Sequence, residues 1–363
     1  MRNTKDLKVV AMTEGSKGLP PRTAASRPGG AKKTAPKPKK KKKKGSVWIK
    51  IMFAVLSVLI LIMLYVGYLA YVATNAVDTI GTANNIVVPE EESVKKKSTG
   101  MVLLGIDSRE KGGGLNTDVM LVAIFNPNTK TASVVSIPRD SVLQVDGYRE
   151  RKANANYSTF FNNARSEKNM DKEAAEADAK KEIREMLSKY FGVELKYTGI
   201  INFKGFTDVV DALDGVEVNV EMDMRYRDTA DGTNINLSKG QQVLDGKNAL
   251  DYVRYRKSNQ GTAESSDFDR NRREMEVIGA IFDKMKSFGG VTKYDKVIGA
   301  VGNNLTLDMP PSEIKNMLST YLGMGSSDIT FQALNGTWKS PYVYVDSTSL
   351  EEARAALQAK MAE

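Results

Sequence analysis

The sequence predicts a layered α/β domain, because short buried strands alternate along the chain with amphipathic helices. Residues 101–106, 119–125 and 133–137 are continuously apolar runs bounded by polar or turn-forming residues. Continuous rather than alternating hydrophobicity predicts strands that are covered on both faces. Helices are predicted at 171–191 and 267–288, where apolar side chains recur with helical spacing.

The other elements follow from the same periodicities. A short helix is predicted over 203–213, where it ends at an Asp-Gly pair. From 216 to 224, valine and methionine alternate with acidic and amide side chains, which predicts one half-exposed strand. Gly192 is a predicted cap for the helix before it, and residues 350–360 are predicted to form a closing helix.

Residues 1–46 form a basic, polar segment that we expect to be a disordered cytoplasmic tail. They hold 15 Lys and Arg against 2 Asp and Glu, whereas residues 51–363 are mildly acidic. The sequence pI of 9.3 therefore describes this tail and not the folded part. A basic pI of that origin is weak evidence for DNA or RNA binding, so no nucleic-acid partner is expected.

Residues 51–72 contain no charged side chain, and these 22 positions are enough for one helical crossing of a bilayer. The run Lys39 to Lys44 precedes them, and positive flanks stay in the cytoplasm. We therefore expect a single-pass transmembrane helix over 47–73, a cytoplasmic N-terminus and an extracellular linker over 74–98. A cleaved signal peptide is the alternative, but its apolar core is usually shorter, about 7–15 residues. An uncleaved signal anchor is favoured.

The chain has no cysteine and no histidine. This excludes a Ser-His-Asp triad, a cysteine nucleophile, a zinc site with histidine ligands and an imidazole base. Any chemistry must use carboxylates, arginines, lysines, hydroxyls, backbone groups or a metal bound by oxygen ligands. An exported domain without disulfides also depends on its hydrophobic core for stability.

Charged side chains stand at the ends of the predicted strands. Asp107 follows the first strand and Asp118 precedes the second, and carboxylates at a sheet edge can hold Mg²⁺. Taken alone, aspartates that cap turns are the more common explanation. Pro138 ends the third strand, and Arg139 with Asp140 follows it. This pair is either a surface ion pair of little energetic value or part of an anion site.

Two pairs of arginines lie further along the chain. In an extended segment Arg254 and Arg256 point to the same side, where an anion would relieve their repulsion. The alternative is a solvated edge strand. Arg270 and Arg273 lie in the first turn of a predicted helix, where a bound phosphate would offset the unfavourable helix dipole. Pairing with acidic residues of the same turn is the alternative. Together with Arg139, these arginines favour a pyrophosphate site and transfer of a phosphorus centre.

A series of stretches follows in order along the chain: LLGIDSR, SIPRDS, KANANY, INFKGFTDVVDALDGVEVNV, LSKGQQVLDGKNALDYVRYR and DFDRNRRE. Together they resemble the motifs of the LytR–CpsA–Psr family of cell-wall glycopolymer ligases. The resemblance runs from about residue 100 to 285, and the catalytic domain is assigned to 99–363. It implies a three-layer α/β/α domain with a mixed central sheet.

The resemblance also implies an activity. Members bind a polyprenyl-(pyro)phosphate-linked glycopolymer, with the lipid tail in an apolar pocket, and transfer the polymer to a peptidoglycan hydroxyl through a phosphodiester link. The chain is therefore expected to be a glycopolymer phosphotransferase in the cell membrane of a Gram-positive-type envelope, assisted by Mg²⁺ or, as the alternative, Mn²⁺. Its expected partners are the lipid-linked polymer (teichoic acid or capsule), the peptidoglycan acceptor and membrane lipid.

Site residues carry over motif by motif. Asp107 and Asp118 match the family's acidic pair, which implies catalytic and metal-binding roles. Arg139 matches the arginine of the Pro-Arg-Asp motif and is expected to act in catalysis as well as in binding. The residues expected to bind the pyrophosphate are Arg139, Lys152, Arg254, Arg256, Arg270 and Arg273.

Three positions depart from the family's pattern. Asn116 stands where arginine is common, Glu274 where glutamine is usual and Asp269 where glycine is usual. The first removes a cation, and the other two add negative charge near the predicted anion site. These departures keep two other functions open. One is a polyprenyl-pyrophosphate phosphohydrolase, in which water replaces the acceptor, and the other is a non-catalytic membrane-anchored binder or regulator.

Overall fold

The computed structural model describes residues 63, 86–107, 114–230, 232–287, 294–302 and 304–363. The chain divides into two units, Met1–Val58 and Leu59–Glu363, and all described residues belong to the second. The predicted tail, nearly all of the predicted transmembrane helix and most of the predicted linker lie outside the described residues. Within the described part, no helix combines the length and the apolar character needed to cross a membrane.

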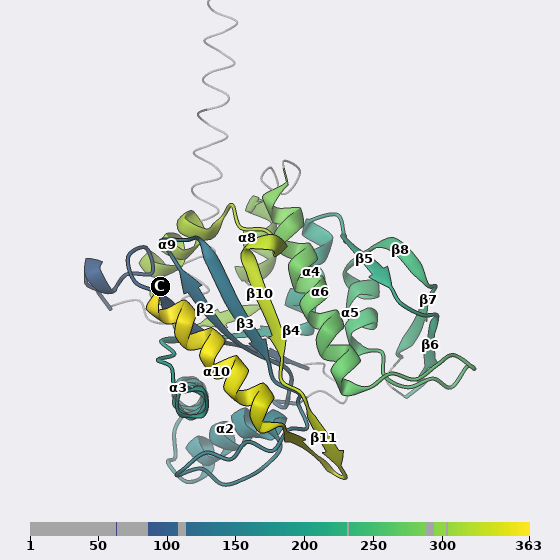
Figure 1. Cartoon of the computed structure of the whole chain (residues 1–363), viewed down its shortest axis with the longest axis horizontal. Coiled ribbons are helices and arrows are strands. Elements are labelled where there is room, and N and C mark those ends of the chain that lie inside the picture. Colours follow the sequence, from purple (N-terminus) through teal and green to yellow (C-terminus); the bar gives the residue numbers. More distant parts are fainter. Residues whose placement is uncertain (1–62, 64–85, 108–113, 231, 288–293, 303) are drawn as a thin grey trace, which may run out of the picture. The chain divides into compact units, whose positions relative to one another are not determined.

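A six-stranded sheet forms the centre of the described domain (Figure 1). Its strands lie in the order β10-β3-β2-β1-β4-β9. β1 runs antiparallel to β2 and parallel to β4, so the sheet is mixed, as expected. The strands are β1 (Thr99–Ile106), β2 (Thr117–Asn126), β3 (Thr131–Ser136), β4 (Tyr197–Asn202), β9 (Leu305–Leu307) and β10 (Ile329–Ala333).

The three apolar runs predicted as strands are confirmed as β1, β2 and β3, and the packing explains their composition. In β1, Val102 and Leu104 pack into one hydrophobic cluster, whereas Met101 and Leu103 pack into another. Alternate side chains of a strand point to opposite faces, so a strand that is covered on both faces needs no polar side.

Helices cover both faces of the sheet. On one face, α2, α3 and α10 pack into the cluster of Val102, and Figure 1 shows α10 crossing β2 and β3. On the other face, α6 and α9 contribute Ile278 and Ile314 to the cluster of Met101. The helices are α2 (Asn156–Ser166), α3 (Lys172–Phe191), α6 (Asp267–Lys286), α9 (Pro311–Tyr321) and α10 (Ser347–Ala362).

The four predicted helices are confirmed as α3, α4 (Phe203–Ala212), α6 and α10, and local chemistry sets the ends of α3. The helix begins after Asp171, whose carboxylate accepts a hydrogen bond from the Ala174 N–H at 2.8 Å. It ends at Gly192, whose φ of 66° is a left-handed conformation that glycine adopts without strain.

Two small antiparallel sheets of two strands each contact α5 (Gly246–Arg254) and α6. They consist of β5 (Val216–Val220) with β8 (Gly240–Leu244), and β6 (Met224–Arg227) with β7 (Asn234–Leu237). The prediction of one strand over 216–224 is wrong in its extent, because β5 and β6 each take a different partner. The predicted alternation holds within β5, where buried valines alternate with exposed side chains.

The remaining elements connect these layers. α4 follows β4 directly, and the side-chain oxygen of Asn202 caps it by accepting the Gly205 N–H at 2.7 Å. The elements are α4 (Phe203–Ala212), α5 (Gly246–Arg254), α8 (Tyr294–Gly302), β11 (Gly336–Lys339), β12 (Tyr342–Val345) and the 3₁₀ turns η1 (Glu90–Glu92), η2 (Ala153–Ala155) and η3 (Ser326–Asp328).

The end of the predicted linker belongs to the folded domain. Val94 is fully buried, and its N–H donates to the Glu313 carboxylate at 2.7 Å. The Ser93 hydroxyl donates to the same carboxylate at 2.9 Å. The folded part therefore begins before residue 98, the boundary that the sequence suggested, because α9 holds the chain just ahead of β1.

Candidate functional site

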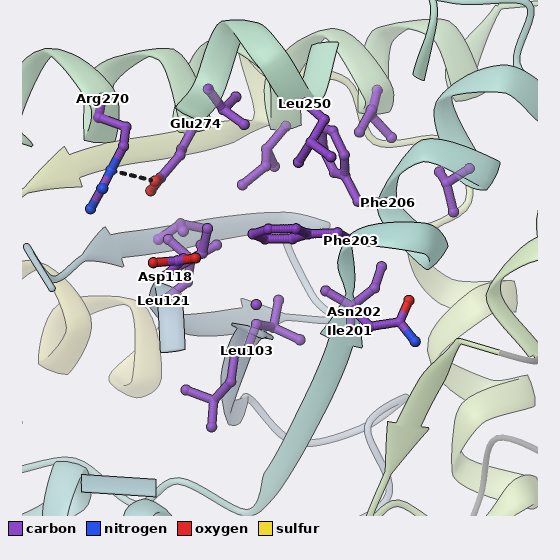
Figure 2. Close-up of a pocket in the computed structure, with 18 of the residues that line it drawn as sticks. Leu103, Asp118, Leu121, Ile201, Asn202, Phe203, Phe206, Leu250, Arg270 and Glu274 are labelled. Atoms are coloured by element: carbon purple, nitrogen blue, oxygen red, sulfur yellow. Dashed lines mark ion pairs between the residues drawn. The ribbon is translucent and has the colours of Figure 1, made fainter. Parts of the chain in front are cut away.

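A cavity of about 530 Å³ lies between the central sheet and helices α4, α5 and α6 (Figure 2). Leu103 and Leu121 of the sheet line it, and so do Phe203 and Phe206 of α4. Most of the other lining residues are also aliphatic or aromatic. Such a cavity suits a hydrocarbon chain, because burial of apolar surface is favourable and few polar groups must lose water.

Charged side chains from four segments line the same cavity. They are Asp118 of β2, Arg139 after β3, Arg254 and Arg256 at the end of α5, and Arg270 and Glu274 of α6. Four guanidinium groups against two carboxylates give this group a positive balance. Because the planar fork of arginine matches phosphate oxygens, an anion attached to an apolar chain fits the combination.

Arg139 stands at the centre of a chain of ion pairs. Its Nη1 donates to Asp118 Oδ1 at 2.7 Å, and its Nε lies 3.9 Å from Asp140 Oδ2. Asp140 is buried, and its Oδ1 accepts a hydrogen bond from Lys152 Nζ at 2.7 Å. The Arg139 side chain is 26% exposed, so a ligand can reach it. Asp140 thus holds two cations in place while Arg139 faces the cavity.

Asp107 and Asp118 leave neighbouring strands at the same edge of the sheet. Asp107 directly follows β1, whose last residue, Ile106, pairs with Thr117 of β2. The carbonyl of Asp107 accepts the Gly114 N–H at 2.6 Å, which closes the loop between the two strands. The two strand ends therefore lie side by side, and of the two aspartates only Asp118 lines the cavity.

The side chains near Asp107 and Asp118 limit the kind of metal site that can form there. Among the described residues, no group of three or more acidic, histidine or cysteine side chains could hold a metal ion. Mg²⁺ commonly takes only one or two protein carboxylates and completes its shell with water and substrate phosphate. In the described part of the chain, this edge of the sheet offers two aspartates, Asp107 and Asp118, which are too few for a metal cage made by the protein alone.

The end of α5 presents Arg254 and Arg256 in a way that the sequence did not predict. Arg254 is the last residue of the helix and Tyr255 follows as its cap, so the predicted extended segment is wrong. The Arg254 guanidinium lies 5.1 Å from the centroid of the Phe203 ring. Both arginines line the cavity, as the predicted anion site requires.

Arg270 and Glu274 form a buried ion pair in the wall of the cavity (Figure 2). The Nε of Arg270 lies 3.5 Å from Glu274 Oε1, and the two side chains are 6% and 5% exposed. They are one turn apart on α6, which places them on the same side of the helix. The carboxylate therefore supplies negative charge where a phosphate oxygen would otherwise be attracted.

The first turn of α6 is capped by its own side chains. The Ser266 hydroxyl accepts the Asp269 N–H at 3.1 Å, and the Asp269 carboxylate accepts the Ser266 N–H at 3.0 Å. This is a capping box, which satisfies N–H groups that a helix start leaves without partners. Asp269, which departs from the family's glycine, thus has a structural explanation.

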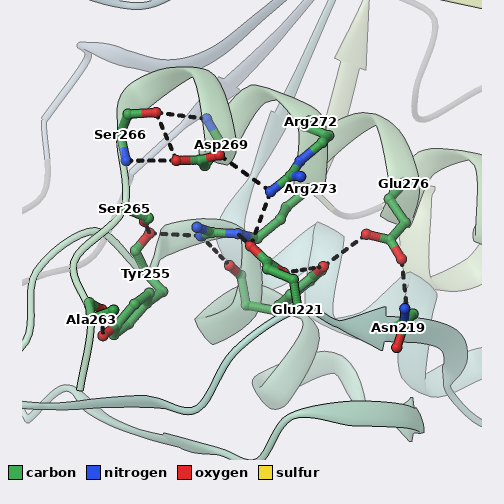
Figure 3. A network of polar contacts seen from close by, with 11 residues as sticks. Asn219, Glu221, Tyr255, Ala263, Ser265, Ser266, Asp269, Arg272, Arg273 and Glu276 are labelled. Carbon is green, nitrogen blue, oxygen red and sulfur yellow. Dashed lines mark hydrogen bonds and ion pairs between the residues drawn. The ribbon is translucent and has the colours of Figure 1, made fainter.

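Arg273 lies elsewhere, although it is only three residues from Arg270. It is fully buried, and its Nε donates to Glu221 Oε1 at 2.8 Å (Figure 3). Its Nη1 donates to the carbonyls of Tyr255 at 2.7 Å and Tyr252 at 3.2 Å. Arg273 is not among the residues lining the cavity. The geometry gives it a structural role at the end of α5, in place of the predicted contact with pyrophosphate.

Burial and hydrogen bonding shift the pKa values of two groups close to Arg273. Burial raises the pKa of the Tyr252 hydroxyl, and the carboxylates of Glu276 and Glu221, which accept its proton at 2.7 and 3.0 Å, raise it further. Burial also acts to raise the pKa of Glu221, but a backbone hydrogen bond and Arg273 outweigh it and lower that pKa. Glu221 is therefore an ionised acceptor shared by Arg273 and Tyr252.

Lys152, a predicted site residue, and Asn116, a departure from the family's pattern, also lie outside the cavity. Lys152 binds Asp140 and places its Nζ 5.9 Å from the centroid of the Trp338 ring. Asn116 is exposed, and its Oδ1 accepts a hydrogen bond from the Ser158 hydroxyl at 2.8 Å. No sequence signal could identify the apolar lining, because residues such as Leu103 have the same pattern as core residues.

A model of the LytR_cpsA_psr family matches residues 66–359. The chain is similar to the polyisoprenyl-teichoic acid–peptidoglycan teichoic acid transferase TagT of Bacillus subtilis, at 34% identity over 60% of this chain and 65% of that protein. It is also similar to TagV of the same organism, at 28% identity over 74% of this chain and 66% of that protein. The chain thus spans slightly less than two thirds of each of these relatives.

Solved structures show the same fold. The crystal structure of B. subtilis TagV aligns with a TM-score of 0.56 at 26% identity, over 74% of this chain and 98% of that one. A structure of TagT bound to LIIa-WTA aligns with a TM-score of 0.53 at 25% identity, over 78% of this chain and 96% of that one.

Proposed function

This chain belongs to the LytR_cpsA_psr family, and we propose that it transfers a glycopolymer from a polyprenyl-(pyro)phosphate carrier to a peptidoglycan hydroxyl, forming a phosphodiester. The observation that supports this most is the apolar cavity of about 530 Å³ with four arginines among its lining residues. That volume lies within the range of about 300–1,000 Å³ typical of ligand sites.

The two parts of the cavity match the two parts of such a donor. The apolar walls accommodate part of the polyprenyl chain, and Arg139, Arg254, Arg256 and Arg270 neutralise its phosphates. Cations placed around a transferring phosphorus stabilise the charge that develops in the transition state. Arg273 is left out of this set, because it does not line the cavity, and its Nε and Nη1 donate to Glu221 and to two backbone carbonyls.

The reaction we propose is one displacement at phosphorus. An acceptor hydroxyl attacks the sugar-linked phosphorus, the new O–P bond forms, and the bond from that phosphorus to the bridging oxygen breaks. Polyprenyl phosphate leaves with the electron pair, and Asp107 or Asp118 takes the hydroxyl proton. Arg139, held by Asp118 and Asp140, keeps the phosphorus in position.

A divalent cation belongs to the proposal as well. Asp107 and Asp118 would hold Mg²⁺, or Mn²⁺ as the alternative, together with phosphate oxygens of the donor. The ion would supply positive charge at the reacting phosphate.

The proposed setting is the outer face of a cell membrane in a Gram-positive-type envelope, with the chain anchored by one helix. Its support is the uncharged segment 51–72 and the lysine run before it. The relatives named above are teichoic acid transferases, so we propose a teichoic-acid-like polymer as the transferred group.

The test uses the full chain in detergent and its Arg139→Ala variant. Each is mixed with a synthetic polyprenyl-pyrophosphoryl disaccharide, Mg²⁺ and soluble peptidoglycan oligomers, and the products are followed by mass spectrometry. We expect a phosphodiester-linked conjugate from the wild type and a loss of about 10²–10³-fold in rate for the variant. Arg149→Ala, which removes an exposed arginine away from the cavity, is the matched control.

Other products would reject the proposal in specific ways. Release of free sugar phosphate without a conjugate would make the protein a phosphohydrolase. Tight binding of the donor without any product would make it a binder, and Asn116→Arg would then be the first variant to examine. A transfer rate unchanged in Arg139→Ala would remove Arg139 from the reaction.

A further inference from the structure

An exposed tryptophan stands on the β11–β12 hairpin, which the reaction described above does not use. Trp338 is 48% exposed and pairs across the hairpin with Val343, which is buried. The side chains of directly paired residues in an antiparallel hairpin point to the same face. On this face the Val343 side chain is packed against the domain, whereas the Trp338 side chain is open to solvent. Part of the apolar indole ring is therefore in contact with water, which is unfavourable unless a ligand covers it.

The hairpin is fixed to the loop that carries Arg139. The Val343 N–H donates to the Asp140 carbonyl, and the Val142 N–H donates to the Val343 carbonyl, both at 2.9 Å. Ser141 and Val343 therefore form an isolated parallel β-bridge. Because backbone hydrogen bonds join the two segments, Trp338 has a defined position relative to Arg139.

Side-chain contacts lead from the phosphate-facing arginine to the indole. Asp140 lies against Arg139 and accepts a hydrogen bond from Lys152 Nζ at 2.7 Å. The same Nζ lies 5.9 Å from the centroid of the Trp338 ring, within cation–π distance. Neither Lys152 nor Trp338 lines the apolar cavity. The surface formed by Trp338 and Lys152 thus lies outside the lipid pocket and is connected to Arg139 through Asp140.

We propose that Trp338 and Lys152 form the subsite for the acceptor glycan, an inference that rests on the function proposed above. In an in-line displacement the attacking oxygen approaches opposite the leaving group, so the acceptor needs a surface outside the cavity that holds the lipid. The C–H face of a pyranose stacks on an aromatic ring. The Lys152 ammonium matches the carboxylates of lactyl-peptide stems, which the acceptor carries beside its pyranose rings, whereas the anionic groups of the donor are the phosphates assigned to the arginines of the cavity.

The opposite face of the hairpin provides a matched control. Tyr344 is 43% exposed, and its ring lies 5.6 Å from Lys339 Nζ. It pairs with Thr337 and therefore points away from the face of Trp338. The two aromatic residues have similar exposure and a nearby lysine, but only Trp338 connects to Asp140 through its lysine.

The first test separates acceptor binding from donor binding in the full chain. Trp338→Ala is expected to raise the KM for peptidoglycan oligomers about tenfold, as when an aromatic anchor is removed, with an unchanged KM for the lipid donor. Trp338→Phe should restore most of the affinity, and Tyr344→Ala should change neither constant. An acceptor KM that stays unchanged in Trp338→Ala overturns the inference.

The second test does not depend on turnover. The chain has two tryptophans, Trp48 and Trp338, so Trp48→Phe leaves Trp338 as the only indole fluorophore. Soluble peptidoglycan oligomers should shift or quench its emission with saturation, and Lys152→Ala should weaken this response. A wild type that makes no conjugate rejects the proposed function. Emission that never responds to the oligomers rejects the subsite, whether or not transfer occurs.

Discussion

Arg270 and Arg273 are three residues apart on α6, and both are buried, yet they have different surroundings (Figures 2 and 3). Arg270 lines the cavity and has Glu274 at 3.5 Å, longer than a good hydrogen bond. Arg273 makes hydrogen bonds of 2.7 to 3.2 Å to Glu221, to the carbonyl of Tyr252 and to that of Tyr255, which follows α5. A closely bonded buried arginine stabilises the fold, whereas one in a cavity wall can bind a ligand.

Helix geometry explains this divergence. Three positions along an α-helix differ by about 60° around its axis. On α6 that rotation separates the side that faces the cavity from the side that faces α5 and Glu221. Arg270 and Arg273 look equivalent in sequence, yet the first faces the candidate ligand site and the second belongs to a structural hydrogen-bond network. Variants of each arginine test this difference.

The largest effect is expected for the stability of Arg273→Ala. The change removes the buried cation that pairs with Glu221, and it removes the donor to the carbonyls of Tyr252 and Tyr255. Removal of one partner from a buried ion pair costs about 3–5 kcal/mol in the free energy of unfolding. Chemical denaturation of the full chain in detergent, followed by circular dichroism, measures it. A loss below about 1 kcal/mol would contradict the structural role of Arg273.

The double variant Arg270→Leu/Glu274→Leu is expected to lose activity with little change in stability. Replacing both members of a buried pair with apolar residues is often neutral or stabilising, so the free energy of unfolding should not fall by more than about 1 kcal/mol. Transfer should decrease by about 10²–10³-fold, because one cation at the reacting phosphate is lost. Equal activity in the double variant and the wild type would remove Arg270 from the site.

A smaller effect is expected for Glu274→Gln. The amide keeps the size of the side chain and removes a negative charge beside Arg270. Affinity for a short-chain polyprenyl pyrophosphate, measured by isothermal titration calorimetry, should rise about tenfold, which corresponds to about 1.4 kcal/mol. Glu264→Gln, which removes an exposed carboxylate before α6, should leave the affinity unchanged. Weaker binding in Glu274→Gln would show that the carboxylate itself contacts the donor.

The smallest effect is a dependence of stability on pH that arises from Glu221. Its pKa is lowered in the folded protein from an ordinary value of 4.5. Its contribution to stability is therefore complete above that value and is lost as the pH falls through the lower folded-state pKa. The midpoint of thermal unfolding should decrease with acidification below about pH 4.5, and the decrease should be shallower in Glu221→Gln. Identical profiles would contradict the ion pair.

Much of the candidate site could be predicted, because the chemistry of phosphate recognition limits the residue types. Asp118, Arg139, Arg254 and Arg256 were named from the sequence, and the structure brings them to one cavity. The backbone conformation of Arg254 and Arg256 could not be predicted in the same way, because two arginines separated by one residue occur in strands and at the ends of helices. No sequence motif marks the aromatic surface at Trp338, so the sequence does not identify it as part of a site.

The sequence by itself determined the residue chemistry, the strands β1 to β3, the ends of α3 and the resemblance to a family, because local patterns of polarity and capping encode them. Only the tertiary structure decided where the cavity lies, which way Arg273 points and that β11–β12 meets the loop of Arg139. Leu103 illustrates the reason. An apolar side chain looks the same in sequence whether it faces packed neighbours or an open cavity, and only the arrangement of distant elements distinguishes the two.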